Sequence, residues 1–297
     1  MTLARTLAPG QRCLVHVTDV VTGQDRIVHE TTEVLLEAPN WTVEDRLVLN
    51  GDGVLWQMPS DGSAPPRVIH HQGLPELNND HVLDPDGVHV HVSGNDGQLH
   101  RAPLAGGRAT RTTRERLGEH GQPLLHFLHG ISPDGATLAY VNLDPQVGFG
   151  VGANIHLVAS DGSDDRELLP GWGPDDGPEF TPDGQWIHFN TERFSPGQAQ
   201  IARVRPDGSE LEQLTFDERV NWFPHCSPDG SRWSHVSFPP GTQGHPADLV
   251  VRLMLVEDDD WRGARCLAEL PGGQGTLNVN SWSPDSRRLA WVSYPFD

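Results

Sequence analysis

The stretch Ser132-Pro133-Asp134-Gly135, followed by Thr137-Leu138-Ala139-Tyr140-Val141, decides the fold because it recurs along the chain. Proline pre-sets a turn, Asp-Gly completes the reversal, and β-branched or aromatic residues follow, so each copy predicts strand, turn, strand. Similar copies begin at residues 84, 181, 227 and 283, and a degenerate copy, Thr42-Val43-Glu44-Asp45, precedes them. Six copies at intervals of 42 to 56 residues indicate a repeat architecture.

Each repeat holds two further strands and a second turn. Ile155-His156-Leu157-Val158 precedes the turn at Asp161-Gly162, and Ile201-Ala202-Arg203-Val204 precedes the turn at Asp207-Gly208. Four antiparallel strands in each repeat are typical of a propeller blade. We therefore predict an all-β, six-bladed β-propeller with four antiparallel strands per blade.

The two ends of the chain complete the last blade. The final repeat has only two strands before Asp297, whereas the N-terminal part supplies two unassigned strands, at 13–18 and 26–30. Joining them leaves no free sheet edge. We expect one domain over residues 1–297, with blade six shared between about 10–30 and 275–297.

These turns and strands resemble those of the TolB-like six-bladed propellers, over residues 31–297. The chain is also distantly similar to oligogalacturonate lyase propellers, a resemblance that implies a divalent metal in the channel, bound by several histidines and a glutamine. Gln274, nine residues before Ser283, is similar to that glutamine. The positions after it are Leu277-Asn278-Val279-Asn280 where histidines are expected, so the resemblance does not imply the lyase reaction.

Composition narrows the classes of partner. The formal charge is −20, and all 21 basic residues are arginine, so the surface repels nucleic acid and anionic membranes. Cys13, Cys226 and Cys266 are widely spaced and odd in number, which predicts neither a disulfide framework nor a cysteine zinc site. With no apolar signal-peptide core and no long apolar run, we expect a soluble cytoplasmic protein.

The candidate site lies on the propeller face opposite the Pro-Asp-Gly turns, where the loops are longer. The innermost strands should bring residues just before each turn together around the channel. Three imidazoles are the predicted metal ligands, His81, His129 and His225, and two of these, His129 and His225, are the catalytic candidates. The remaining predicted ligand-binding residues are polar or aromatic: Asp80, Asp176, Glu179, Trp222, His245, Gln274 and Asn280.

The sequence leaves two functions open. The first is the binding, with or without processing, of a small polar, carbohydrate-like ligand in a histidine-rich funnel, with or without a divalent metal. The second is a non-catalytic scaffold whose acidic loop face docks a protein partner. Polar propeller channels also hold water, so the histidines could instead only bridge solvent, and the fold alone does not decide.

Overall fold

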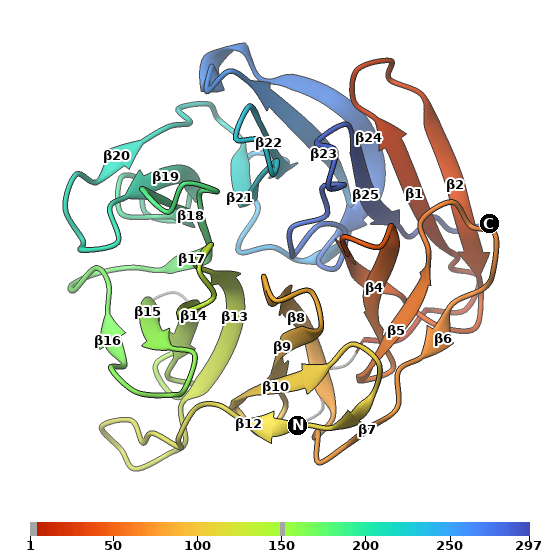
Figure 1. Cartoon of the computed structure of the whole chain (residues 1–297). Helices are drawn as coiled ribbons and strands as arrows, with labels where there is room; N and C mark the ends of the chain where they lie inside the picture. The colour runs from red at the N-terminus through yellow and green to blue at the C-terminus, as the bar shows by residue number, and fades with distance from the viewer. Residues whose placement is uncertain (1–4, 149–151) are drawn as a thin grey trace.

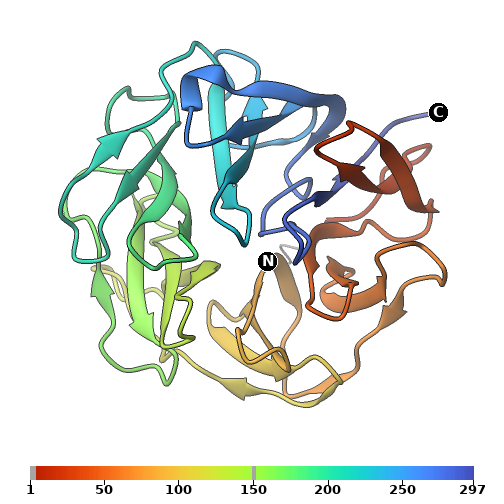
Figure 2. The same cartoon turned by 45° about the horizontal axis from the view of Figure 1, so that its top comes forward.

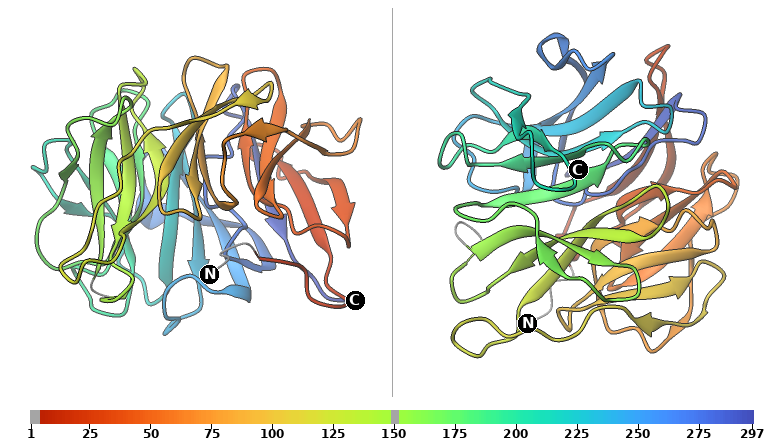
Figure 3. Two further views of the ribbon diagram at one scale, coloured as in Figure 1. Left: turned by 90° about the horizontal axis from the view of Figure 1, so that it is seen from below. Right: turned by 60° about the vertical axis from the view of Figure 1, so that its left-hand side comes forward.

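The computed structural model describes residues 5–148 and 152–297 as a closed ring of six blades. Figure 1 shows the ring along its axis, Figure 2 shows it tilted, and Figure 3 shows the strands running between its two faces. The prediction of a six-bladed all-β propeller is confirmed. No helix in the described ranges is long and apolar enough to cross a bilayer.

The first five blades are antiparallel sheets of four strands, ordered from the axis to the rim. Their strands are β3 (Glu37–Trp41), β4 (Arg46–Gly51), β5 (Val54–Pro59) and β6 (Arg67–Val68); β8 (Leu77–Leu83), β9 (His89–Gly94), β10 (Leu99–Pro103) and β12 (Thr110–Arg111); β13 (Leu125–Ile131), β14 (Thr137–Leu143), β15 (Ala153–Ala159) and β16 (Arg166–Glu167); β17 (Asp175–Phe180), β18 (Ile187–Thr191), β19 (Gln200–Val204) and β20 (Glu212–Gln213); β21 (Val220–Cys226), β22 (Arg232–Phe238), β23 (Ala247–Glu257) and β24 (Arg265–Gly273). A short parallel pair, β7 (His71–Gln72) with β11 (Gly107–Arg108), and a 3-10 turn, η1 (Trp261–Gly263), lie outside these sheets.

Blade six is closed by both ends of the chain, as predicted. Strand β25 (Arg288–Ser293) pairs antiparallel with β1 (Cys13–Asp19), and β1 pairs with β2 (Asp25–Thr31). The innermost strand of this blade is irregular, because the segment before the last turn makes only the isolated bridge Trp282↔Leu289. Blade six is therefore a three-stranded sheet with a looped inner segment.

A buried network of polar and aromatic side chains connects the strands β1, β2 and β25 of blade six. The ring of His16 on β1 stacks on Trp291 of β25 at 3.7 Å. Its Nδ1 lies 2.8 Å from Asp25 and its Nε2 lies 2.9 Å from the Ser293 hydroxyl, while the Trp291 indole donates to Thr18 at 2.8 Å. Hydrogen bonds and ring stacking therefore act on the same strand pair.

The Pro-Asp-Gly turns form as the sequence predicts. In blade three, Asp134 accepts a hydrogen bond of 2.6 Å from the Ser132 hydroxyl, and Gly135 has φ 72°. That left-handed conformation favours glycine. The degenerate copies place Asp45 (φ 60°) and Ser286 (φ 57°) in the same region, so they form the same reversal.

The hydrophobic core is divided among the six interfaces between blades, with one cluster of buried side chains at each. The cluster between blades four and five, for example, contains Ile201, Cys226, Trp233, Val256 and Trp261. Because neighbouring blades cover both faces of the inner strands, strands such as β17 and β21 are buried throughout, whereas the outer strands β2, β12 and β16 are largely exposed.

Bulges interrupt the innermost strands just before the turns. The register shifts between Leu77 and His81 in β8, between Asp176 and Glu179 in β17, and between Trp222 and His225 in β21, and β3 and β13 have similar shifts. A bulge re-aims the side chains that flank it. Side chains that strict alternation would place between two blades can therefore face the channel.

Candidate functional site

A hollow of about 170 Å³ lies at the loop-face mouth of the channel, and we call it the loop-face hollow. The innermost strands β8, β13, β17 and β21 surround the central channel (Figure 1). The hollow is lined by Asn78, Asn79, Asp80, Phe127, His129, Leu143, Asp176, Phe223, His245, Gln274 and Asn278. Five predicted site residues thus meet here: Asp80, His129, Asp176, His245 and Gln274.

His129 is the charged centre of the loop-face hollow. Its Nε2 lies 3.1 Å from the Asp176 carboxylate, its Nδ1 lies 3.3 Å from the carbonyl oxygen of Asn278, and its ring lies 5.6 Å from that of Phe223. Burial favours the neutral ring, but the carboxylates of Asp80 and Asp176 outweigh it and raise the pKa of His129 to about 9. At neutral pH His129 is therefore an imidazolium that donates hydrogen bonds to the Asp176 carboxylate and to the carbonyl oxygen of Asn278.

Asp80 faces the same hollow with one oxygen uncommitted. Burial raises the pKa of Asp80 to about 6, and the positive charge of His129 limits that rise. Its Oδ2 accepts a hydrogen bond of 2.8 Å from Asn78, and the neighbouring Asn278 side chain also lowers its pKa, whereas its Oδ1 reaches hydrogen-bond geometry with no described residue. A carboxylate with a pKa near 6 can exchange a proton close to neutral pH.

Amides and a second histidine complete the wall. Gln274 accepts a hydrogen bond from Nδ1 of His245, accepts another from Asn278 at 3.3 Å, and donates to Asn79 at 3.3 Å. The Nε2 of His245 lies 3.7 Å from Asp176, and burial lowers the pKa of this histidine. Gln274 therefore joins the inner segment of blade six to blades two and five.

Trp222 stands behind this wall rather than in it. It is buried, and its ring packs 4.4 Å from that of His245 and 5.7 Å from that of Phe223. It does not line the loop-face hollow. Trp222 therefore supports the rings of His245 and Phe223, which do line the hollow.

Three other predicted residues form a separate cluster, nearer to the Pro-Asp-Gly turns. Glu179 accepts hydrogen bonds from Nδ1 of His225 at 2.6 Å, from the amide of Cys226 at 2.8 Å and from Asn280 at 2.8 Å. The second ring nitrogen of His225 lies 3.0 Å from the carbonyl oxygen of Leu277. This cluster links blades four, five and six, and its polar atoms are committed to one another.

The opposite mouth holds a larger hollow of about 530 Å³, ringed by the prolines of the turns. Glu179, Asn280 and His129 line it, together with apolar side chains such as Ile131 and Trp282. His129 lines both hollows, so this side chain lies between the two mouths of the channel.

The three predicted metal ligands are not assembled into one set. His81 is buried in β8, its ring nitrogens reach hydrogen-bond geometry with no described residue, and burial lowers its pKa to about 4. Both ring nitrogens of His129 and both of His225 face acceptor oxygens, which require N–H groups there. A metal needs a nitrogen lone pair, so these residues do not fit a divalent cation as they stand.

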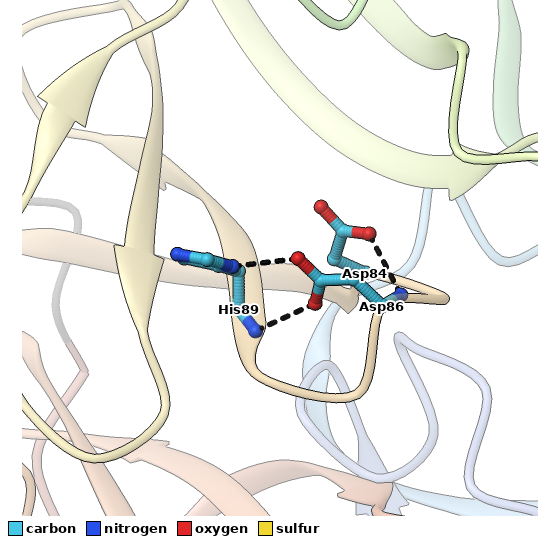
Figure 4. A group of neighbouring side chains, drawn as sticks. All are labelled: Asp84, Asp86 and His89. Carbon is cyan, nitrogen blue, oxygen red and sulfur yellow. Dashed lines mark hydrogen bonds and ion pairs between the residues drawn. The ribbon is translucent and has the colours of Figure 1, made fainter.

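Within the described ranges, one group has ligand atoms that all lie within 4.8 Å of one another: Asp84, Asp86 and His89 (Figure 4). It lies at a Pro-Asp-Gly turn, outside the loop-face hollow. Its two carboxylates already share a cation, because Arg101 donates to Asp84 at 3.0 Å and to Asp86 at 2.6 Å, and His89 lies 2.6 Å from Asp86. A cation would have to displace Arg101.

Several lining residues were not predicted from the sequence: Asn78, Asn79, Phe127, Leu143, Phe223 and Asn278. Four lining residues share one register, five positions before their turns: Asn79, Phe127, Asp176 and Asn278. Comparing that register across the repeats would have found three of the missed residues. Alternation along each strand also relates this register to that of His81 and His129, two positions later, but in β8 a bulge lies between the two registers and His81 does not line the hollow.

An uncharacterized protein of Agrobacterium fabrum is 35% identical over 288 residues, which cover 95% of this chain and 92% of the relative. A solved structure from Agrobacterium tumefaciens, named as a candidate TolB, is 34% identical and superposes with a TM-score of 0.86, covering 96% and 99% of the two chains. The chain belongs to the TolB-like propeller family. No family model matches it.

More distant structures share the fold of this TolB-like chain and no more. An oligogalacturonate lyase in complex with manganese has a TM-score of 0.55 at 12% identity, covering 87% of this chain and 67% of the lyase. A gluconolactonase from Xanthomonas campestris has a TM-score of 0.57 at 14% identity, with coverage of 88% and 86%. At these identities the site must be argued from its own residues.

Proposed function

We propose that this TolB-like propeller binds a small, polar, carbohydrate-like molecule in the loop-face hollow. The observation that carries the proposal is the composition of its wall. Ionised or ionisable groups (Asp80, His129, Asp176) and amides (Asn79, Gln274) lie beside the apolar rings of Phe127 and Phe223. Polar groups that fix hydroxyls, beside apolar surfaces that contact C–H groups, suit such a ligand.

If the ligand is processed, two side chains of the same hollow would share the proton transfers. In this proposal His129, protonated at neutral pH, donates to a ligand oxygen, and Asp80, with its pKa of about 6, accepts a proton. His225 takes no catalytic part, because its ring nitrogens are committed to Glu179 and Leu277. The proposal includes no metal, since the histidine nitrogens face acceptor oxygens.

The test is a thermal-shift screen of neutral sugars, sugar acids and amino sugars on the intact chain, because a ligand that binds only the folded state raises the melting temperature. Hits should be lost in Asp176→Asn, which removes the negative charge that pairs with His129. They should persist in Asp165→Asn, a matched control whose carboxylate lies 3.0 Å from His156 in blade three. A screen without hits, or hits indifferent to Asp176→Asn, would make the docking scaffold the better explanation.

The protein is expected to work in a reducing compartment. Its three cysteines are unpaired, with Cys13 and Cys226 buried and Cys266 exposed. The cytoplasm fits this thiol chemistry. Fractionation of the native host, with antibody detection of the chain, tests the compartment directly.

A further inference from the structure

Two polar atoms in the loop-face hollow are buried without a partner among the described residues: Oδ1 of Asp80 and Nδ2 of Asn79. Both residues are about nine-tenths or more buried, and both line the hollow. Leaving such groups unpaired costs about 1 to 3 kcal/mol each, and more for a charged group. They are therefore the atoms that a ligand in this hollow would satisfy.

The neighbouring hydrogen bonds hold these two atoms in place. Asn78 donates to the other oxygen of Asp80 at 2.8 Å, and the amide of Asp80 donates back to Asn78 at 2.9 Å. Gln274 donates to the Asn79 oxygen at 3.3 Å. One acceptor oxygen and one donor nitrogen are thus left over, on adjacent residues of β8.

A hydroxyl group both donates and accepts, so it can satisfy this pair. A carbonyl or carboxylate only accepts and leaves the oxygen of Asp80 unpaired. An ammonium only donates and leaves the amide of Asn79 unpaired. The pair of orphaned atoms therefore selects hydroxyl groups.

The charges in the hollow point against an anionic ligand. Its wall has two carboxylates, Asp80 and Asp176, and the one imidazolium, His129, is already paired with Asp176 at 3.1 Å. No arginine lines it among the described residues, and the nearby Arg5 is committed to Glu37 at 2.8 Å. A sugar acid would bury its carboxylate beside like charges, without a free cation to pair with.

Size and apolar surface limit the ligand to one ring. The hollow of about 170 Å³ is smaller than the roughly 300 to 1,000 Å³ of pockets that hold drug-sized ligands. Phe127, Leu143 and Phe223 supply the faces against which the C–H groups of a ring pack.

We propose that the ligand is an uncharged polyhydroxylated ring, a neutral monosaccharide or cyclitol, whose hydroxyls are read by Asn79 and Asp80, and that sugar acids are rejected. This inference rests on the proposed function, which requires only that the loop-face hollow binds a polar ligand. It names the class of that ligand.

Isothermal titration of the intact chain with matched probes tests the inference: galactose against galacturonate, glucose against glucuronate, glucose against glucosamine, and myo-inositol. A neutral probe should bind about tenfold or more tightly than its acid. Asn79→Asp, which turns the donor into an acceptor with little change in shape, should weaken neutral binding by about tenfold. Asp80→Ala should do the same, and Asp165→Asn should not.

The outcomes separate the two proposals. If a sugar acid binds as tightly as the matching neutral sugar, and Asp176→Asn abolishes that binding, the proposed ligand class is wrong but the proposed function stands. If glucosamine binds more tightly than glucose, the hollow prefers a cation, and the proposed class of uncharged ligands is also wrong. If no probe binds, because the hollow holds water only, both proposals fail. Melting curves of each variant confirm that it is folded before titration.

Discussion

At the scale of single residues, His129 gives the site a pH dependence with a definite sign. Its pKa rises from 6.5 to about 9 on folding, so the stabilisation it provides is complete below pH 6.5 and is lost as pH rises through 9. The free energy of unfolding should therefore fall between pH 6.5 and 9, by at most about 1.4 kcal/mol per pH unit from this group. Urea titrations across that range measure it.

The variant His129→Gln should flatten this slope, because the titrating group is gone. His188→Gln is the control: His188 is also buried, but its pKa lies well below 6.5, so above about pH 7.5 neither its folded nor its unfolded form titrates and its variant should keep the slope. Equal slopes in wild type and His129→Gln would mean that Asp80 and Asp176 do not hold the charge on His129.

Glu179 should matter for stability rather than for binding. Replacing it with Ala leaves Nδ1 of His225 and the amide of Cys226 without their acceptor, while Asn280 keeps only its bond to the carbonyl oxygen of Cys226. Losing one partner of a buried cluster costs about 3 to 5 kcal/mol. Glu212→Ala, in an exposed pair with Arg203, should cost less than about 1 kcal/mol. Similar midpoints in urea for the two variants would argue against the inter-blade role.

At the scale of elements, closure of blade six decides whether the ring is stable. Deleting residues 12–30 removes β1 and β2, exposes β25 as an open edge, and removes the contacts of His16 with Trp291. We expect insoluble protein, scored by the soluble fraction after expression. A truncated chain that stays soluble and melts cooperatively would refute the shared blade.

A circular permutant is the matched control for that deletion, because it keeps every strand. The amide of Asp297 donates to the carbonyl of Gly10 at 3.0 Å, so a short linker can join Asp297 to Gly10 in place of residues 1–9. New termini between β2 and β3, at Glu33, leave all the pairings intact. This permutant should fold with a melting temperature close to that of the wild type.

Much of the architecture was predictable from the sequence because turns are local. Proline and glycine at fixed offsets specify the reversals, and even the degenerate copy at Thr42–Asp45 forms one, with Asp45 at φ 60°. The bulges in the innermost strands left no comparable signal, since they depend on how neighbouring blades pack. The site prediction therefore named Asp80, His129 and Asp176 but missed Asn79 and Asn278. It also grouped His225 with residues of a different cluster.

At the scale of the whole molecule, the ring should be held by packing and hydrogen bonds, with no covalent link between blades. Cys13 lies in the cluster between blades six and one, Cys226 in that between blades four and five, and Cys266 is exposed on β24. Burial raises the pKa of Cys13 to about 12 and also raises that of Cys226, so neither forms a reactive thiolate while the ring is closed.

A thiol reagent should modify one cysteine in the native protein and three in urea. In Cys266→Ser the native count should fall to zero, and the melting temperature of the wild type should not change with reductant. Two or more reactive thiols in the native state would show that the blades separate locally, and a lower melting temperature on reduction would reveal a disulfide.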